Sequence, residues 1–166
     1  MTAAHTPHSA PDIERFRQMY LATLPADSEI RSRPFLPDAF GDSPELADEL
    51  AALILAGTKT ATCSALWEYE AEGVQPPGAG TITILLSGRG EPRAILETTE
   101  VTLRAFRDVD TAFAFEEGED DRTLASWRKA HWKYFSRVLP KIGREPADDM
   151  PLVCERFRVL WRPPGI

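Results

Sequence analysis

A lysine among three threonines follows a predicted helix end. The segment Gly57-Thr58-Lys59-Thr60-Ala61-Thr62 opens with a glycine, which often ends a helix, and continues as a threonine-rich strand. Lys59 and Thr62 are three residues apart, so a regular strand would place them on opposite faces. They converge only if the chain leaves the helix irregularly. On spacing alone, the commoner explanation is a solvated lysine that favours the helix dipole.

The segment 116–121 carries five carboxylates in six residues. Acidic residues favour a helix start, where they accept hydrogen bonds from free N–H groups, so Asp120 or Asp121 is expected to cap a helix that begins near Thr123. Capping explains one or two of these carboxylates, and clustered like charges repel. We therefore expect a basic partner or a functional role for the others.

The predicted helix from Thr123 to Leu139 has an aromatic face and a basic face. Stripes such as its aromatic one are more often core than binding platforms. The stripe comprises Leu124, Trp127, His131 and Tyr134 or Phe135. On another face, Lys129, Lys133 and Arg137 stand at i, i+4 and i+8, and we call these three residues the basic ridge. Basic side chains interleaved with aromatic ones suit single-stranded nucleic acid, although a solvated helix face is the alternative.

The charge of the chain is polarised. A net charge of −7 argues against a polyanionic partner. The segment from Arg122 to Arg144, however, has seven basic residues and no acidic one, so the remainder carries −14. Because the local field governs where an anion docks, this segment remains a candidate contact for nucleic acid.

The chain lacks the residue patterns of several other kinds of functional site. A zinc site needs clustered His and Cys, but two of the three histidines lie in the first eight residues, and Cys63 and Cys154 are isolated in sequence. There is no phosphate-binding loop and no GxGxxG fingerprint. Ser64, His131 and an aspartate could form a triad by residue type, yet no nucleophile elbow surrounds Ser64. We expect neither a metal nor a cofactor.

The predicted elements mix strands and helices without regular βαβ alternation, which favours an α+β domain with a curled antiparallel sheet. Helices are expected at Pro11–Leu24, from Ser43-Pro44 to Gly57, and at Thr123–Leu139, and strands at Thr58–Leu66, Thr81–Leu86, Arg93–Leu103 and Leu152–Trp161. Pro25–Pro37, with three prolines, is expected to be a loop.

The chain of 166 residues fits one domain, predicted over residues 11–162 after a disordered tail at 1–10. No apolar run approaches the roughly 18 residues that span a bilayer. The N-terminus lacks the apolar region of a secretory signal, and two cysteines are too few for a disulfide scaffold. These features predict a cytoplasmic protein without a membrane partner, and they leave its oligomeric state open.

Taken together, these segments resemble the ASCH (ASC-1 homology) family, whose fold is similar to the PUA RNA-binding barrel. The resemblance runs from about Phe40 to Trp161. It rests on Phe40-Gly41-Asp42-Ser43, Gly57-x-Lys59-x-x-Thr62, Ile95-Leu96-Glu97-Thr98-Thr99-Glu100-Val101, Phe106-x-x-Val109, Glu117-Gly118-Glu119, Asp121-x-x-Leu124 and Trp127-Arg128-x-x-His131. The glycine–lysine–threonine element alone is weak, but in this order the motifs are specific.

The resemblance implies a PUA-like, curled antiparallel β-barrel with flanking helices that acts on RNA or modified nucleosides. A shorter branch of the family hydrolyses the acetyl amide of N4-acetylcytidine with a lysine, a threonine and a glutamate. By motif position these are Lys59, Thr62 and Glu117. The longer bacterial branch, which this chain resembles in length, is ribonuclease-like. We therefore expect an RNA-binding protein with metal-independent, ribonuclease-like hydrolysis; the alternatives are an amidohydrolase of N4-acetylcytidine-type nucleosides and a non-catalytic RNA-binding module.

Around this catalytic set, the expected substrate contacts include stacking of a base on Trp67 and a phosphate contact from Arg128. The full expected set is Ser64, Trp67, Arg128, His131, Lys129, Lys133 and Arg137. The chain departs from the family pattern at Asp120, which replaces a glycine and adds charge, and at Gly80-Thr81, which replaces Gly-Asp. Lys59 could activate the Thr62 hydroxyl if burial lowers its pKa, whereas a carboxylate at Glu117 favours the charged lysine. A charged Lys59 would instead bind phosphate or stabilise an oxyanion.

Overall fold

The structure is a computed structural model that describes residues 10–165. The helices are α1 (Ala10–Leu21), α2 (Pro44–Leu55), α3 (Leu66–Glu72), α4 (Thr111–Glu117) and α5 (Leu124–Val138), and the strands are β1 (Phe35–Asp38), β2 (Ala61–Ala65), β3 (Ile82–Leu86), β4 (Pro92–Ala105) and β5 (Pro151–Trp161). Short 3-10 turns occupy Glu29–Ser32, Phe106–Asp108 and Leu139–Ile142. The tail expected over residues 1–10 lies outside the described residues except for Ala10, which begins α1.

The five strands form one sheet in the order β1-β3-β4-β5-β2. All four predicted strands belong to it, which confirms the α+β class. The predicted loop Pro25–Pro37 hides the fifth strand, β1, which pairs in parallel with β3, so the sheet is mixed rather than purely antiparallel. The edge strands β1 and β2 do not pair with each other. The sheet therefore curls without closing into a hydrogen-bonded barrel.

The two longest strands bend the sheet. The register between β4 and β5 shifts at Ile95/Leu96 and again between Thr98 and Glu100. Such irregularities insert an extra residue and increase the local bend and twist of a strand. The bend gives the sheet a concave face, and the threonines and carboxylates described below lie on it.

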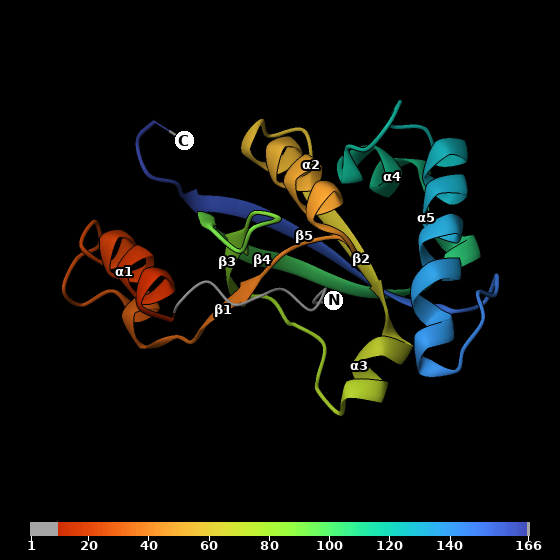
Figure 1. The fold of residues 1–166 in the computed structure, drawn as a ribbon, viewed down its shortest axis with the longest axis horizontal. Coiled ribbons are helices and arrows are strands. Elements are labelled where there is room, and N and C mark those ends of the chain that lie inside the picture. Colours follow the sequence, from red (N-terminus) through yellow and green to blue (C-terminus); the bar gives the residue numbers. More distant parts are fainter. Residues whose placement is uncertain (1–9, 166) are drawn as a thin grey trace.

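Helices pack against different parts of the bent sheet (Figure 1). At one end, Phe16 and Tyr20 of α1 pack against isoleucines of β3 and β4. At the other end, Trp127 and Phe135 of α5 belong to a cluster that includes residues of α4, β2 and β5. The Ser43 side chain caps α2 by accepting a hydrogen bond from the Leu46 N–H at 3.2 Å. In the part of the chain that the structure describes, no helix has the length and apolar character needed to cross a membrane.

Candidate active site

Lys59 lies in an irregular segment between α2 and β2. Gly57 adopts a φ of +77°, a left-handed conformation that suits glycine and ends the helix. The backbone N–H groups of Thr58 and Lys59 both donate to the Leu53 carbonyl, at 3.0 and 3.1 Å. Strand β2 starts only at Ala61. The irregular exit from the helix that the sequence requires is therefore present, and it turns the Lys59 side chain into the interior, where it is 1% exposed.

A glycine brings the second half of the site against Lys59. Gly118 ends α4 with a φ of +73°, and a Cβ there would lie 2.4 Å from the Thr58 carbonyl oxygen and 2.9 Å from the Lys59 Cα. Only glycine therefore allows the end of α4 to approach this backbone so closely. The approach is fixed by the Thr60 N–H, which donates to the Glu116 carbonyl at 2.8 Å.

The residues on either side of Gly118 hold the lysine. Lys59 Nζ donates to Glu117 Oε2 and to Glu119 Oε1, both at 2.8 Å, and also lies 3.3 Å from the Glu117 carbonyl oxygen. His131 Nε2 lies 3.5 Å from Glu117 Oε2. His131 Nδ1 is 2.9 Å from the Trp127 carbonyl oxygen, which can only accept, so the proton is assigned to Nδ1. The imidazole stacks on the Trp127 ring at 4.2 Å.

Burial and neighbouring charges determine the protonation states of Lys59 and Glu117 in this cluster. Burial by itself would lower the pKa of Lys59, but the carboxylates of Glu117 and Glu119 outweigh burial and raise it. Burial likewise opposes ionisation of Glu117, yet Lys59 and His131 hold the Glu117 pKa well below its usual value. Burial by itself would lower the pKa of His131, but the carboxylates of Glu117 and Glu119 together raise it. Lys59 is therefore an ammonium and Glu117 a carboxylate, which opposes a general-base role for Lys59.

Two adjoining cavities open beside this cluster. The outer cavity has a volume of about 440 Å³, and the inner one, of about 110 Å³, reaches Glu117, Glu119 and His131. The residues that line both are Asp38, Phe40, Thr62, Ser64, Tyr69 and Glu155. Lys59 lines neither cavity, because it lies enclosed behind Glu117.

The cavity lining is strongly acidic. Its carboxylates are Asp38, Glu68, Glu72, Glu117, Glu119 and Glu155. Among these lining residues, Arg137 is the only arginine or lysine, and His131 is the only histidine. Lys59 compensates two of these carboxylates from behind. A cavity of one charge sign repels ligands of the same sign, so this lining favours a neutral group over a phosphate.

Glu155 is a site residue that the sequence analysis missed. It lies opposite Thr62 in the antiparallel β2–β5 pair and lines both cavities. Burial, with the nearby Asp38 carboxylate adding to it, raises the pKa of Glu155 to about 7, while a hydrogen bond from Thr98 at 3.4 Å acts in the other direction. Its signal in the sequence is an acidic residue between Val153 and Phe157 on the inward face of the last strand.

The structure brings together only part of the predicted site. Thr62, Ser64, Glu117, His131 and Arg137 line the cavities, whereas Trp67, Arg128, Lys129 and Lys133 do not. Trp67 packs against the apolar cluster beneath α5, with the Arg144 guanidinium 4.8 Å from its ring centroid. Arg128 is exposed and donates to the Arg107 carbonyl at 3.0 Å. The expected stacking on Trp67 and phosphate contact from Arg128 are thus not supported by their positions.

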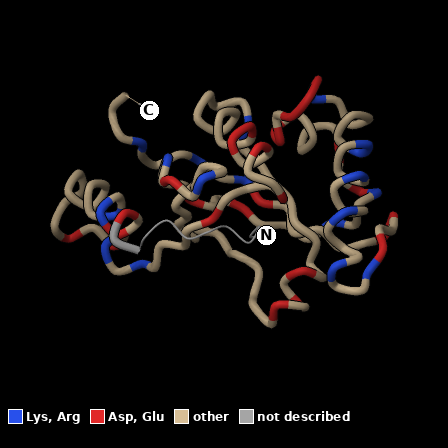
Figure 2. Tube along the Cα trace, in the orientation of Figure 1, with Lys and Arg blue, Asp and Glu red and all other residues tan. Residues whose placement is uncertain are grey.

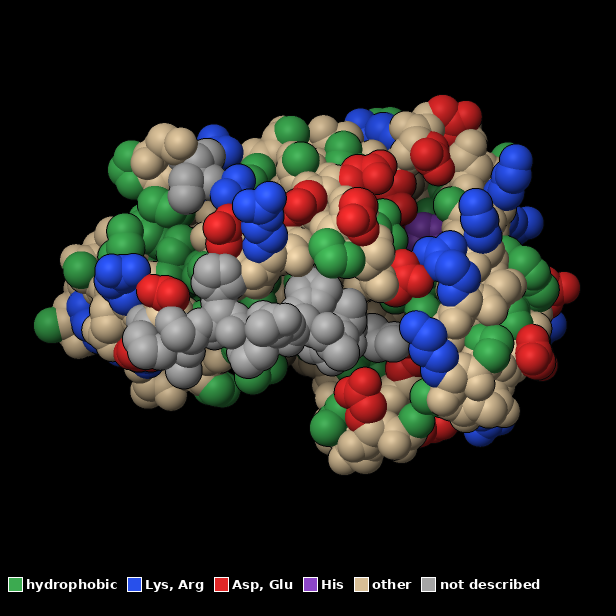
Figure 3. Space-filling model, in the orientation of Figure 1, with side chains coloured by type: hydrophobic (Ala, Val, Ile, Leu, Met, Phe, Trp, Pro, Cys, Tyr) green, Lys and Arg blue, Asp and Glu red, His purple; other side chains and the backbone are tan. Residues whose placement is uncertain are grey.

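The basic ridge is exposed along α5, and Figures 2 and 3 show basic residues along this helix. Arg137 makes two hydrogen bonds to the Asp42 carboxylate, at 2.9 and 3.0 Å. Lys129 and Lys133 form no ion pair with any other described residue. The acidic run at 116–121 does not pair with the basic ridge. Glu116 binds Arg156, and Glu117 and Glu119 bind Lys59.

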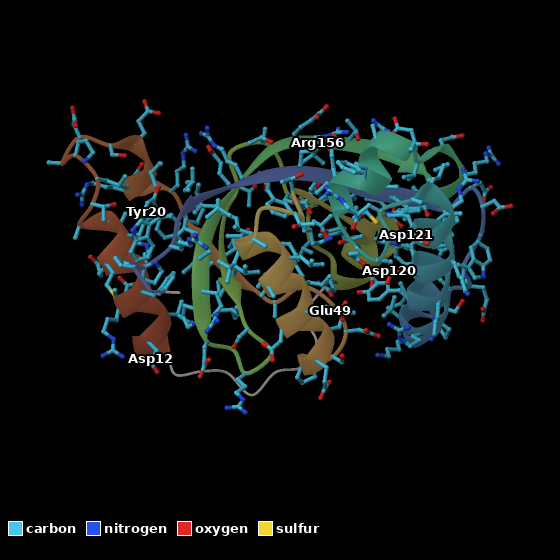
Figure 4. The ribbon with its side chains drawn as sticks, turned by 90° about the horizontal axis from the view of Figure 1, so that it is seen from above. Asp12, Tyr20, Glu49, Asp120, Asp121 and Arg156 are labelled. Carbon is cyan, nitrogen blue, oxygen red and sulfur yellow. The ribbon has the colours of Figure 1, made fainter. Side chains whose placement is uncertain are left out.

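The loop between α4 and α5 explains two other features of the acidic run (Figure 4). Asp120 adopts a φ of +50°, in the left-handed region where the family usually has glycine and where aspartate is tolerated. Its side chain is exposed and lines neither cavity, so its charge lies outside the site. The helix cap is Thr123, not an aspartate, while Asp121 accepts hydrogen bonds from Thr123 at 2.7 and 3.0 Å.

One group of side chains could act as metal ligands. Ligand atoms of Cys63, Glu117 and His131 all lie within 4.8 Å of one another, so Cys63 is not isolated as the sequence suggested. Burial and the Glu117 carboxylate raise the pKa of Cys63, which favours the thiol over the thiolate that metals bind. The Lys59 ammonium already neutralises Glu117 and would compete with a bound cation.

The curled mixed sheet with its flanking helices, and the buried lysine–glutamate pair beside its concave face, define a PUA-like domain. Residues 37–161 match the sequence model of the ASCH domain, so the chain belongs to the ASCH domain family. This family has a PUA-like fold that is associated with RNA binding.

Solved structures agree with this assignment. The chain is similar to an ASCH domain from Lactobacillus crispatus JV V101, with 32% identity over 95% of this chain and 98% of that one, and a TM-score of 0.85. It is also similar to the protein EF3133 from Enterococcus faecalis V583, with 36% identity over 90% of this chain and 88% of that one, and a TM-score of 0.80. No curated protein matches the chain significantly.

Proposed function

We propose that this protein is an RNA-directed hydrolase that takes a single nucleoside into its cavity and hydrolyses an uncharged acyl amide on the base. The observation that carries this proposal is the acidic lining around Thr62, Glu117 and Glu155. A phosphodiester placed there would meet like charge, whereas a neutral amide would not. The outer cavity, at about 440 Å³, is in the range of small-molecule sites, and the inner cavity of about 110 Å³ adjoins it.

In this function each residue of the predicted catalytic set has a role that fits its position. Thr62 presents a hydroxyl to both cavities and is the nucleophile that the family resemblance implies. Glu117 faces the inner cavity as a carboxylate and can accept hydrogen bonds from N–H groups of the substrate. Lys59 does not reach the cavity and acts as a positioning residue that holds Glu117 and Glu119.

The test is release of acetate from N4-acetylated cytidine, followed by NMR. Wild-type protein should release acetate, and Thr62→Val, which keeps the side-chain shape without the hydroxyl, should lose at least about 100-fold in rate. Glu100→Gln, an exposed residue of β4, is the matched control and should keep the wild-type rate. Absence of acetate release by the wild-type protein would contradict the proposed amide hydrolysis.

Ribonuclease-like hydrolysis is the second candidate, and the basic ridge favours it. Only a polymer has a backbone that the exposed Lys129 and Lys133 could contact while one nucleotide reaches the cavity. The test is cleavage of single-stranded RNA in the presence of EDTA. Cleavage that Thr62→Val abolishes would support this candidate, whereas binding without cleavage of RNA or nucleoside would support a non-catalytic RNA-binding module.

A further inference from the structure

Thr62 and Glu155 face each other on the concave side of the sheet. They are register partners in the β2–β5 pair, and directly opposed residues have Cβ atoms about 4.5–5.5 Å apart. Both side chains line the outer and the inner cavity. A molecule that contacts the Thr62 hydroxyl is therefore within reach of the Glu155 carboxyl group.

The described groups around Glu155 come from several elements, and none of them is a cation paired with it. Thr98 of β4 donates its hydroxyl at 3.4 Å, Asp38 of β1 contributes a second carboxyl group, and Tyr69 of α3 contributes a phenol to the same lining. Among the described residues, no lysine or arginine lies within ion-pair distance of Glu155. The arginine of the inner cavity, Arg137, makes its ion pair with Asp42, and His131 of that cavity faces Glu117.

The lysine and the glutamate of the predicted catalytic set are already committed to each other. Lys59 carries its proton in a buried pair with Glu117 and Glu119, and it lines neither cavity. Glu117 is bound by that ammonium and faces His131. A threonine hydroxyl needs a base before it can attack. Neither partner of the buried ion pair is available to accept its proton.

We propose that Glu155 is the catalytic residue that moves the proton, acting as general base and then as general acid for Thr62. This inference rests on the proposed hydrolase function. Glu155 accepts the Thr62 hydroxyl proton as Oγ bonds to the acyl carbon, and it delivers that proton to the amide nitrogen as the C–N bond breaks. The nucleobase leaves with a free amino group, and the acyl group remains as an ester on Thr62. A water molecule then attacks the ester carbon and gives one proton to Glu155. Glu155 returns that proton to Thr62 Oγ as the ester C–O bond breaks, and the carboxylic acid leaves.

The environment of Glu155 suits this cycle. A general acid–base group works best when its pKa is near the working pH, because both protonation states are then populated. Burial beside Asp38 raises the pKa of Glu155 to about 7. The same enclosure keeps the carboxyl group next to the reacting atoms rather than in bulk solvent.

The experiment is the pH profile of acetate release from N4-acetylated cytidine by wild-type, Glu155→Gln and Glu100→Gln proteins. The wild-type kcat/KM should rise with pH through a midpoint near neutrality. Glu155→Gln, which keeps size and shape, should lose about 100-fold or more in kcat with a small change in KM, and its profile should lack this midpoint. Glu100→Gln should match the wild-type profile.

A second variant separates chemistry from folding. Asp38→Asn removes a like charge beside Glu155, so the midpoint should move to lower pH while Glu155 remains in place. If Glu155→Gln fails to fold, the pH midpoint of Asp38→Asn tests the role of Glu155 instead. A midpoint equal to that of the wild type overturns the inference. An active wild-type protein with an unchanged Glu155→Gln profile overturns the role of Glu155 alone. A wild-type protein without activity on the nucleoside overturns the proposed function together with it.

Discussion

Lys59 Nζ lies 2.8 Å from Glu117 Oε2, and each side chain is only 1% exposed. Removing two charges from water is costly, and the geometry here offsets that cost through Glu119 and the Glu117 carbonyl as further acceptors. The pair therefore joins α4 to the segment after α2 and fixes a carboxylate at the inner cavity. The Glu117 and Glu119 carboxylates, which outweigh the effect of burial on the pKa, are why the lysine holds its proton.

Lys59→Met should lower the free energy of unfolding by about 3–5 kcal/mol, because it leaves the buried Glu117 carboxylate without its cation. Lys59→Met combined with Glu117→Gln should recover part of this loss, since the uncompensated charge is gone. Urea denaturation measures both, with the exposed Lys129→Met as the control. Equal stability of the single variant and the wild type would show that the ion pair is not needed for folding. Loss of activity in a Lys59 variant thus requires a folding measurement beside it.

Gly118→Ala tests the close approach of α4 to Thr58. Gly143 is a matched control, because its φ of +72° is nearly the same but an added Cβ would meet nothing within 4 Å. Gly143→Ala should cost about 1–2 kcal/mol for the left-handed backbone alone. Gly118→Ala should cost clearly more, since its Cβ would lie 2.4 Å from a backbone oxygen that cannot move independently. Similar melting temperatures for the two variants would refute the packing argument.

The pH dependence of stability tests the environment of Glu155. Its pKa is raised from 4.5 to about 7 in the folded protein, so the folded state retains a proton that the unfolded state has lost. The contribution of Glu155 to the free energy of unfolding should therefore fall as pH rises from about 4.5 to 7 and level off above. Glu155→Gln removes this contribution, so relative to wild type it should gain on the order of 1–3 kcal/mol between pH 5 and pH 8. Denaturation at both pH values measures the difference, and a difference that does not change with pH would contradict the raised pKa.

Most of the fold could be predicted from the sequence because the patterns that mark its helices and strands are local. Alternating apolar residues mark β3 and β4, and the serine–proline start and glycine end mark α2. Strand β1 was not predicted because it has four residues, includes Pro37 and pairs in parallel with a strand distant in sequence. The glycine–lysine–threonine and glutamate–glycine–glutamate motifs indicated Lys59 and Glu117, but their contact depends on Gly118 meeting Thr58. That is a tertiary contact, and spacing along the chain does not reveal it.

Residues that act through position were the hardest to find. Glu155 belongs to no recognised motif, and it becomes a site residue only because β2 pairs with β5 in a register that places it opposite Thr62. Trp67 shows the opposite case, in which residue type suggested a role that the position does not support. Its type suits base stacking, but α3 turns it toward the apolar cluster beneath α5. Residue type identifies possible chemistry, whereas the direction of the side chain decides whether a substrate can meet it.

The basic ridge should contribute to RNA binding and little to folding. Lys129 and Lys133 are exposed and make no ion pair with other described residues, so replacing both with alanine should leave the melting temperature nearly unchanged. Each lost phosphate contact to a single strand should reduce the slope of log K against log salt by about 0.7, so the double variant should lose about 1.4. Arg137 is left intact because it holds Asp42.

RNA affinity measured at several salt concentrations checks this expectation, with the exposed Arg89→Ala as a control that removes one positive charge elsewhere on the molecule. Hydrolysis of a free nucleoside should hardly change in the double variant, because that substrate has no backbone to contact the ridge. A wild-type salt slope in the double variant would mean that α5 does not guide RNA. The exposed lysines would then be a solvated helix face, and a lowered melting temperature would assign the ridge a structural role instead.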